Sequence, residues 1–334
     1  MKADLEQIWY GDSLAGRLHA LMRLPAALGY CLHLARYRRR FRSGRAATVR
    51  LSAPVIVVGN ITVGGTGKTP VVQWLVGALR ERGWRPGIIS RGYGGEEATE
   101  PRRVPPDGDP ARFGDEPVLL ARETGCPVAV CPDRPTAGRL LLDSGDCDCL
   151  VADDGLQHLA LERDIELVVV DGQRGFGNGL CYPAGPLREP RARLRSVDLV
   201  ITNGGGREGA GFRLEPGAFK PVDGREGVAQ WADFSTKPVH AVAAIGNPDR
   251  FFRLLEERGL RIERHAFPDH HPFSPDDLDF GDGHPVLMTA KDAVKCAAFA
   301  PAHYWYLPVR LLPDAAMADA MDRILDGLGN PPDN

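Results

Sequence analysis

The sequence predicts an α/β protein built from a phosphate-binding P-loop unit, a second and smaller α/β unit, and a helical segment at the N-terminus. Three observations support this fold class. A strand, a glycine-rich turn and a helix follow one another within residues 55–80. An apolar strand within residues 148–154 ends in two aspartates, and a further series of strand, turn and helix begins at Val239.

The predicted P-loop lies between an apolar run and a helix. Residues 55–58 have the β-branched composition of a buried strand, and the apolar spacing in residues 71–80 predicts a helix. Glycines in the turn let backbone N–H groups approach an anion at the helix N-terminus. Lys68 would reach the β- and γ-phosphates, and the Thr69 hydroxyl would hold Mg²⁺. The turn consists of Gly64, Gly65, Thr66, Gly67, Lys68 and Thr69.

This loop departs from the usual pattern at two positions. The pattern G-x-x-x-x-G-K-[ST] requires a glycine where this chain has Thr62. The variant loop of P-loop switch ATPases usually has a lysine where this chain has Val63. A glycine-rich turn that binds nothing is the alternative, but the flanking strand and helix favour a phosphate site.

Carboxylates occur at two further places in the same unit. The strand predicted before Asp153 and Asp154 is typical of a Walker B element, which places a carboxylate beside Mg²⁺. Acids at the carboxyl edge of a parallel sheet face the crevice where ligands bind. Asp115 and Glu116 open another predicted helix, where N-terminal capping is the alternative to a functional role.

Two arginines are candidates for phosphate contacts. Arg188 lies in a loop, residues 178–190, whose proline and glycine content fixes its shape. Arg91 follows a predicted strand at residues 86–90, and a surface arginine is an equally acceptable interpretation of it.

The composition excludes several classes of function. The chain has 334 residues, 43% of them hydrophobic, and a net charge of -3, which predicts no general affinity for nucleic acid. Its seven cysteines form no C-x-x-C pair, so they indicate neither a disulfide framework nor a zinc site. This usage fits a reducing, cytoplasmic compartment, and no cleavable signal is expected.

Residues 1–45 predict an amphipathic helical segment that lies on a membrane. Apolar residues recur at helical spacing, and Pro25 is expected to break or kink the helix before a second apolar stretch at residues 26–35. The run is too short and too charged to span a bilayer, whereas its arginine-rich end, residues 36–42, suits a surface of anionic lipid. A helical hairpin packed on the domain and an RNA-binding patch are the alternatives.

The predicted domain limits follow breaks in composition. We expect the N-terminal segment at residues 1–45, the P-loop domain at 46–208, a linking β-ribbon at 209–236 and a C-terminal α/β domain at 237–330. The ribbon is expected from two extended segments, residues 212–219 and 228–234, that would pair with each other.

Motifs along nearly the full length give the chain a family resemblance. The motifs are Gly59-Asn60-Ile61-Thr62-Val63-Gly64-Gly65-Thr66-Gly67-Lys68-Thr69-Pro70, Ser90-Arg91-Gly92-Tyr93-Gly94, Gly114-Asp115-Glu116-Pro117, Asp153-Asp154-Gly155-Leu156-Gln157-His158, Pro186-Leu187-Arg188-Glu189, Phe267-Pro268-Asp269-His270-His271 and Thr289-Ala290-Lys291-Asp292-Ala293-Val294-Lys295. With these motifs in this order, the sequence resembles the tetraacyldisaccharide 4′-kinases, the lipid A 4′-kinases of Gram-negative bacteria. Leu156 and Ala290 stand where that family would be expected to have Phe and Glu.

The resemblance implies an activity and a location. It implies transfer of the γ-phosphate of ATP, with Mg²⁺, to the 4′-hydroxyl of tetraacyldisaccharide 1-phosphate, a glycolipid. It further implies two α/β/α domains joined by a β-ribbon, and a peripheral position on the anionic cytoplasmic face of the inner membrane. A monomer that binds no nucleic acid is expected.

The resemblance also implies residue roles. Asp115 and His270 match a pair thought to prepare the sugar hydroxyl, with His271 as the adjacent competitor of His270. Lys68 and Arg188 would neutralise phosphate charge. ATP would be bound by Thr62, Val63, Gly64, Gly65, Thr66, Gly67, Lys68 and Thr69, and Mg²⁺ by Thr69, Glu116, Asp153 and Asp154.

Two other classes of protein remain as alternatives at this point. The first is a membrane-associated P-loop switch ATPase that acts on a protein partner, and the second is a non-enzymatic membrane adaptor with a degenerate nucleotide fold. The switch ATPase class gives no reason for Asp115 and His270, and it usually needs the lysine that Val63 replaces.

Overall fold

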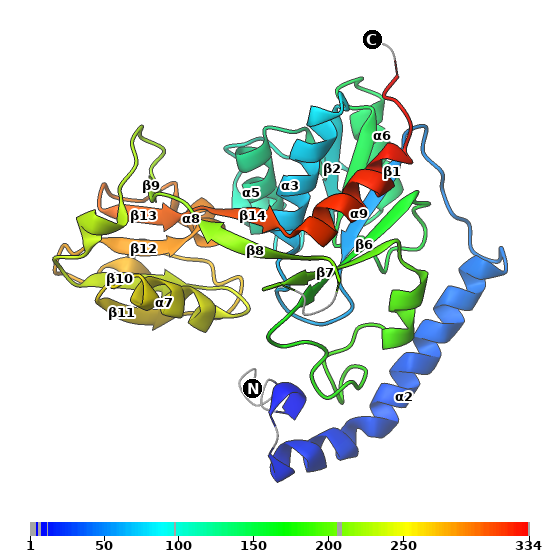
Figure 1. Ribbon diagram of the computed structural model, residues 1–334, viewed down its shortest axis with the longest axis horizontal. Helices are drawn as coiled ribbons and strands as arrows, with labels where there is room; N and C mark the ends of the chain where they lie inside the picture. Colours follow the sequence, from blue (N-terminus) through cyan, green and yellow to red (C-terminus); the bar gives the residue numbers. More distant parts are fainter. Residues whose placement is uncertain (1–4, 6–7, 12, 97, 206–208, 333–334) are drawn as a thin grey trace.

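A sheet of nine strands forms the centre of the larger part of the molecule in the computed structural model, which describes residues 5, 8–11, 13–96, 98–205 and 209–332 (Figure 1). Neighbouring strands are parallel except at the two ends, where β3 pairs antiparallel with β4 and β14 with β8. The order is β14 (Val309–Pro313), β8 (Gly211–Pro216), β7 (Leu199–Asn203), β6 (Ile165–Asp171), β1 (Val55–Gly59), β5 (Cys149–Asp153), β2 (Pro86–Ser90), β4 (Val128–Val130) and β3 (Arg102–Arg103).

Helices cover both faces of this sheet, which explains the continuous apolar runs of its central strands. Ile56 and Val58 of β1 pack in one core with α3 (Lys68–Glu81), α5 (Asp115–Thr124) and α9 (Ala315–Asp326). Val55 and Val57, which point to the opposite face, pack with α6 (Arg134–Leu142). The short helices α4 (Pro110–Phe113) and η1 (Arg191–Ser196) complete this part.

A second sheet has five strands and lies largely in the part of the sequence where a second α/β unit was predicted. Its helices are α7 (Pro248–Glu257) and α8 (Ala290–Cys296), which contribute to two separate hydrophobic clusters, together with the short helices η2 (Trp231–Phe234) and η3 (Pro275–Leu278). The strand order is β11 (Ile262–Ala266), β10 (Val239–Ala243), β12 (Val286–Thr289), β13 (Tyr304–Leu307) and β9 (Lys220–Pro221).

The chain passes between the two sheets along an antiparallel pair of strands, but not the predicted pair. β8 pairs with β14 through five residue pairs, from Val309–Pro216 to Pro313–Phe212 (Figure 1). The predicted partner, residues 228–234, contributes one bridge, Phe219–Ala229, and the helix η2. The prediction was wrong because β14 lies about a hundred residues away in sequence, and no local pattern pairs it with β8.

The C-terminal helix also differs from the predicted domain limits. Met317, Met321 and Leu325 of α9 are buried in the core of the nine-stranded sheet, so residues 315–326 return to the P-loop part of the molecule. The predicted limit between residues 208 and 209 adjoins residues 206–208, which lie outside the described residues.

Residues 14–42 form one continuous helix, α2 (Leu14–Arg42), where a break or a kink at Pro25 was predicted. Pro25 lies inside it and does not end it, although the ribbon bends partway along (Figure 1). The helical-hairpin alternative is therefore wrong for these residues. Among the described residues, no helix has both the length and the apolar character needed to cross a membrane.

Candidate active site

A cleft of about 1550 Å³ lies between the two sheets. One wall is formed by the P-loop and the carboxyl ends of β5, β6 and β7, and the other by loops that follow β10 and β11. The two walls approach closely at Gly246, where a Cβ atom would lie 3.1 Å from the Gly65 nitrogen. A side chain at position 246 would therefore require the P-loop backbone to shift by a few tenths of an ångström.

The P-loop has the backbone of a phosphate cradle. Gly67 is the N-cap of α3 in the left-handed conformation, with φ 95°, and a Cβ atom there would lie 2.5 Å from Asn203 Nδ2. Residues 63–69 line the cleft, whereas Thr62 is buried and bridges Leu187. The Val63 N–H donates to Pro186 O at 2.8 Å. The ligand-binding roles of Thr62 and Val63 remain predictions.

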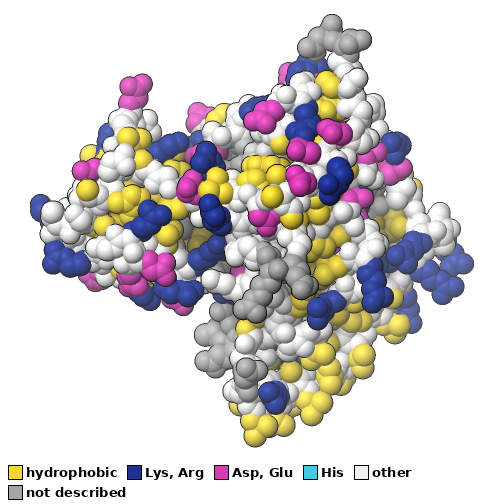
Figure 2. Space-filling model, in the orientation of Figure 1, with side chains coloured by type: hydrophobic (Ala, Val, Ile, Leu, Met, Phe, Trp, Pro, Cys, Tyr) yellow, Lys and Arg dark blue, Asp and Glu magenta, His cyan; other side chains and the backbone are white. Residues whose placement is uncertain are grey.

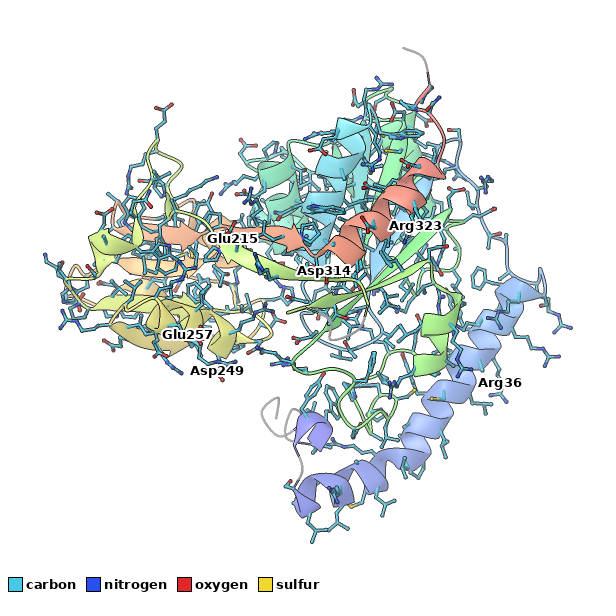
Figure 3. All side chains as sticks on the ribbon, viewed as in Figure 1. Arg36, Glu215, Asp249, Glu257, Asp314 and Arg323 are labelled. Atoms are coloured by element: carbon cyan, nitrogen blue, oxygen red, sulfur yellow. The ribbon has the colours of Figure 1, made fainter. Side chains whose placement is uncertain are left out.

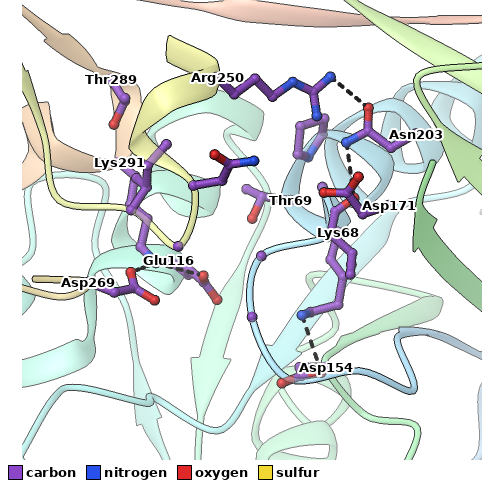
Figure 4. Close-up of a pocket in the computed structure, with 18 of the residues that line it drawn as sticks. Lys68, Thr69, Glu116, Asp154, Asp171, Asn203, Arg250, Asp269, Thr289 and Lys291 are labelled. Carbon is purple, nitrogen blue, oxygen red and sulfur yellow. Dashed lines mark hydrogen bonds and ion pairs between the residues drawn. The ribbon is translucent and has the colours of Figure 1, made fainter. Parts of the chain in front are cut away.

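Asp154 brings two predicted cationic residues together. Lys68 Nζ lies 3.5 Å from Asp154 Oδ1 (Figure 4). Arg188 Nη1 donates to Asp154 Oδ2 at 3.0 Å. Burial alone would raise the pKa of Asp154, but the charges of Lys68 and Arg188 outweigh it and lower the pKa to about 2. Asp154 is therefore ionised and holds both cations at the mouth of the P-loop.

Asp153 is different, because it is buried without a partner. It is 1% exposed, and neither carboxylate oxygen has a hydrogen-bond partner among the described residues. The pKa of Asp153 is raised to about 7, mainly by burial and in second place by the charge of Glu116. An orphaned carboxylate beside a second carboxylate and the P-loop Thr69, which also lines the cleft, fits the oxygen ligands that Mg²⁺ prefers.

Asp115 and His270 are in contact although they are 155 residues apart. His270 Nδ1 lies 2.9 Å from Asp115 Oδ2 and 3.1 Å from Oδ1. Asp115 is the first residue of α5 and is 5% exposed, while His270, with φ 63°, lines the cleft. Asp115 Oδ1 also accepts the Glu116 N–H at 2.9 Å. A local capping contact and a long-range contact therefore coexist at this carboxylate.

Lys291, at the start of α8, completes this group of charges. Its Nζ lies 3.0 Å from Glu116 Oε1 and 3.5 Å from Asp269 Oδ1 (Figure 4). It also lies 3.4 Å from His270 Nε2. Because an ammonium only donates, it favours His270 with a bare Nε2 and a proton on Nδ1, which then donates to Asp115. Burial would raise the pKa of Asp115, but the bond from His270 and the charge of Lys291 outweigh it and lower the pKa.

His271 occupies a different environment from its neighbour. It stacks on Phe267 with ring centroids 4.8 Å apart, and its Nε2 lies 3.3 Å from Asp277 Oδ2. The geometry therefore favours His270 as the partner of Asp115. Arg91 is exposed and lines the cleft, so a phosphate contact from it remains a prediction.

Among the polar residues of the cleft to which sequence reasoning gave no role, four make contacts that shape it. Arg134 is 4% exposed and donates to the Asp154 carbonyl at 3.4 Å. Asn203 Nδ2 donates to Thr66 O at 3.0 Å, and Arg250 of α7 donates to Asn203 Oδ1 at 3.0 Å, which links the second sheet to the P-loop. The fourth is Lys291. Position at a strand end or helix start was the available signal for each of them.

Comparison with known proteins identifies related chains over nearly the full length. The family model for tetraacyldisaccharide-1-P 4′-kinase matches residues 19–326. The chain is 52% identical over 327 residues to tetraacyldisaccharide 4′-kinase of Alkalilimnicola ehrlichii, covering 97% of each chain. It is 51% identical over 340 residues to the corresponding protein of Aromatoleum aromaticum, covering 98% of each.

A solved structure shows the same architecture. The "apo" form of LpxK from Aquifex aeolicus, crystallised in complex with ATP, matches with a TM-score of 0.77 and 25% sequence identity. The match covers 92% of this chain and 99% of that chain.

Proposed function

The chain belongs to the tetraacyldisaccharide 4′-kinase family and is a lipid A 4′-kinase that uses ATP, and from this premise we propose how its residues perform the transfer. The observation on which the proposal rests is the contact between the buried Asp115 and His270, which lines the same cleft as the P-loop. The acceptor is the 4′-hydroxyl of tetraacyldisaccharide 1-phosphate, and a cleft of about 1550 Å³ is larger than the usual small-ligand pocket of roughly 300–1,000 Å³.

The P-loop holds the nucleotide. Backbone N–H groups of the loop and the N-terminus of α3 bind the phosphates of ATP, and Lys68 neutralises charge that develops at the β–γ bridge. Arg188, which Asp154 holds at 3.0 Å, neutralises charge on the transferred group. Lys68 and Arg188 already lie at the same carboxylate, so little movement of their side chains is needed.

Mg²⁺ fits the carboxylates of the cleft. Asp153, Glu116 and Thr69 would hold it, with Asp154 as the further candidate, and the ion would supply positive charge beside the phosphates. A bound cation would also satisfy the two Asp153 oxygens that have no partner among the described residues.

Asp115 and His270 prepare the acceptor. The hydroxyl oxygen forms a bond to the γ-phosphorus, the bond to the β–γ bridging oxygen breaks, and the hydroxyl proton is accepted or oriented by the Asp115 carboxylate. His270 holds that carboxylate through Nδ1 and lines the cleft. Lys291, whose Nζ lies 3.8 Å from Asp115 Oδ2, helps to lower the pKa of that carboxylate.

ATP turnover is therefore expected to depend on the glycolipid. Without the acceptor, the pair has no sugar hydroxyl to prepare, so ADP release should stay near the background of a Lys68→Ala preparation. With it, one ADP should appear for each lipid phosphorylated, as measured by coupled ADP detection and lipid chromatography. Rapid ATP hydrolysis that ignores the glycolipid would contradict the proposal.

We further propose that the chain acts as a monomer and lies on the cytoplasmic face of the inner membrane through α2. One chain supplies both walls of the cleft, which supports a monomer. Figure 2 shows apolar and basic side chains together along the surface that α2 forms, and Arg36 projects from the helix (Figure 3). The exposed large apolar residues of α2 are Leu14, Leu18, Leu21, Met22, Leu28 and Leu32.

The inner side of α2 contacts the active-site loop. The Tyr30 hydroxyl donates to Arg188 O at 2.8 Å, and Arg38 forms an ion pair with Glu189, which is buried. Arg38 is therefore a structural residue rather than a free surface charge. A test of membrane binding should leave it in place.

Replacing the other arginines of the helix end with glutamine should weaken binding to anionic vesicles. Each basic residue near such a surface contributes about 1 kcal/mol, and salt screens the attraction. Vesicle sedimentation at two salt concentrations measures this for the variant with Arg36, Arg39, Arg40 and Arg42 replaced.

A charge-matched control is available on exposed arginines away from α2. Binding should be retained by the variant in which glutamine replaces Arg213, Arg258, Arg261 and Arg310. An equal loss of vesicle binding in the two variants, or binding that does not change with salt, would contradict a specific role for α2.

A further inference from the structure

A second group of potential metal ligands lies in the five-stranded sheet, outside the active-site cleft. His240 of β10 is paired in register with Glu263 of β11, and Val242 is paired with His265. Because side chains alternate along a strand, His240, Glu263 and His265 lie on one face of the β10–β11 pair. None of the three lines the cleft. The residues near β10 that do line it come after the end of that strand.

The three side chains converge. His240 Nδ1 lies 3.0 Å from His265 Nε2 and 3.6 Å from a Glu263 carboxylate oxygen, and His265 Nε2 lies 3.9 Å from the other oxygen. One ligand atom from each residue lies within 4.8 Å of the others. His240 is buried, His265 is half-buried and Glu263 is exposed, so the group opens to solvent on the Glu263 side.

Neighbouring residues hold the two imidazoles in place. Asp282 accepts from His240 Nε2 at 3.0 Å, and Asp282 Oδ1 is itself fixed by the His284 N–H at 2.9 Å. A proton on Nε2 leaves His240 Nδ1 with a bare lone pair that faces His265. Phe280 stacks on both rings, with centroids 4.0 Å and 4.2 Å away. A carboxylate behind a histidine is the usual support of a metal ligand.

We propose that His240 Nδ1, His265 Nε2 and the Glu263 carboxylate bind one divalent transition-metal ion of the zinc type, with water in the remaining position. Two nitrogens bound to tetrahedral zinc at 2.0–2.1 Å lie roughly 3.3 Å apart, so the 3.0 Å separation needs to open only slightly. Two imidazoles and one carboxylate favour zinc over Mg²⁺, which prefers oxygen ligands.

The position of the group indicates what the ion would do. β11 is the edge strand of the sheet, and the loop that follows it contains Asp269 and His270. An ion shared by β10 and β11 ties this edge strand to the sheet. Because it would bind the folded chain, it should raise the temperature of unfolding as its concentration rises.

Titration of the tag-free chain with ZnCl₂, in the presence of saturating Mg²⁺, tests the proposal. Calorimetry should show one zinc ion per chain, and thermal unfolding should shift upward with zinc. Glu263→Gln, an exposed position, should weaken binding at least tenfold, and His265→Ala should abolish it. Asp282→Asn should weaken it by roughly 10- to 100-fold, as is usual for a residue that supports a ligand.

Glu226→Gln serves as the matched control, because Glu226 is an exposed acid in another loop of the same part of the molecule. It should bind zinc as the unaltered chain does, and circular dichroism of each variant separates lost binding from lost folding. Absence of stoichiometric binding, or binding that survives Glu263→Gln and His265→Ala unchanged, would overturn the proposal.

Discussion

Replacing Lys68 with alanine is expected to lower kcat by roughly 10²–10³-fold while the protein stays folded. The ammonium lies at the N-terminus of α3, 3.5 Å from Asp154, where it meets the charge that develops between the β- and γ-phosphates. Loss of one preorganised charge contact typically costs about 3–4 kcal/mol in the barrier. Initial rates of lipid phosphorylation at saturating ATP and acceptor measure the effect.

The fold should tolerate this change, since Asp154 keeps its contact with Arg188 at 3.0 Å. Lys237→Ala removes an exposed lysine elsewhere and should leave kcat unchanged. Near-normal phosphorylation by a folded Lys68→Ala protein would contradict the assignment of the P-loop.

Asp115→Ala and His270→Ala should each lower kcat by about 10²–10⁴-fold, the usual contribution of a general base. The carboxylate is ionised because the His270 bond and the Lys291 charge lower its pKa despite burial. It can therefore accept a hydrogen bond from the attacking hydroxyl. Neither side chain belongs to the P-loop, so the affinity for ATP, measured by equilibrium binding, should change far less than kcat.

His271→Ala is the matched control, because it removes a neighbouring imidazole that contacts Asp277 and Phe267 rather than Asp115. The kcat of His271→Ala should stay within a few-fold of that of the unaltered chain. A further variant, Asp115→Asn, keeps the shape of the Asp115 side chain while removing its charge. Equal losses for His270→Ala and His271→Ala would point to damage of the loop rather than to a catalytic pair.

Local patterns predicted the elements that contain the site. Each of these elements is specified by a pattern that spans about fifteen residues or fewer. The patterns are the apolar run at residues 55–58, the glycines before Lys68 and the acids at the end of β5. β1, α3 and β5 therefore appear where expected. The central strands were predictable because a sheet covered on both faces requires apolar residues at every position, as Val55 to Val58 show.

Long-range pairing was not predictable in the same way. The segment at residues 212–219 has extended character, but only the structure shows that β8 pairs with β14. Pro25 suggested a break or a kink, and α2 continues through it to Arg42 with a bend partway along (Figure 1). Lys291 and Arg250 became part of the site only when the second sheet was placed against the P-loop, because neither lies in a local pattern that indicates phosphate chemistry.

The Asp115–His270 contact is the central claim, and a double-mutant cycle on kcat tests it most directly. Two residues that act as one unit give non-additive losses, so Asp115→Ala with His270→Ala should be little worse than the worse single variant. The cycle needs kcat for four proteins at saturating ATP and glycolipid, with folding of each confirmed by circular dichroism. Losses that multiply fully in the double variant would show that the two side chains act independently and would contradict the pair.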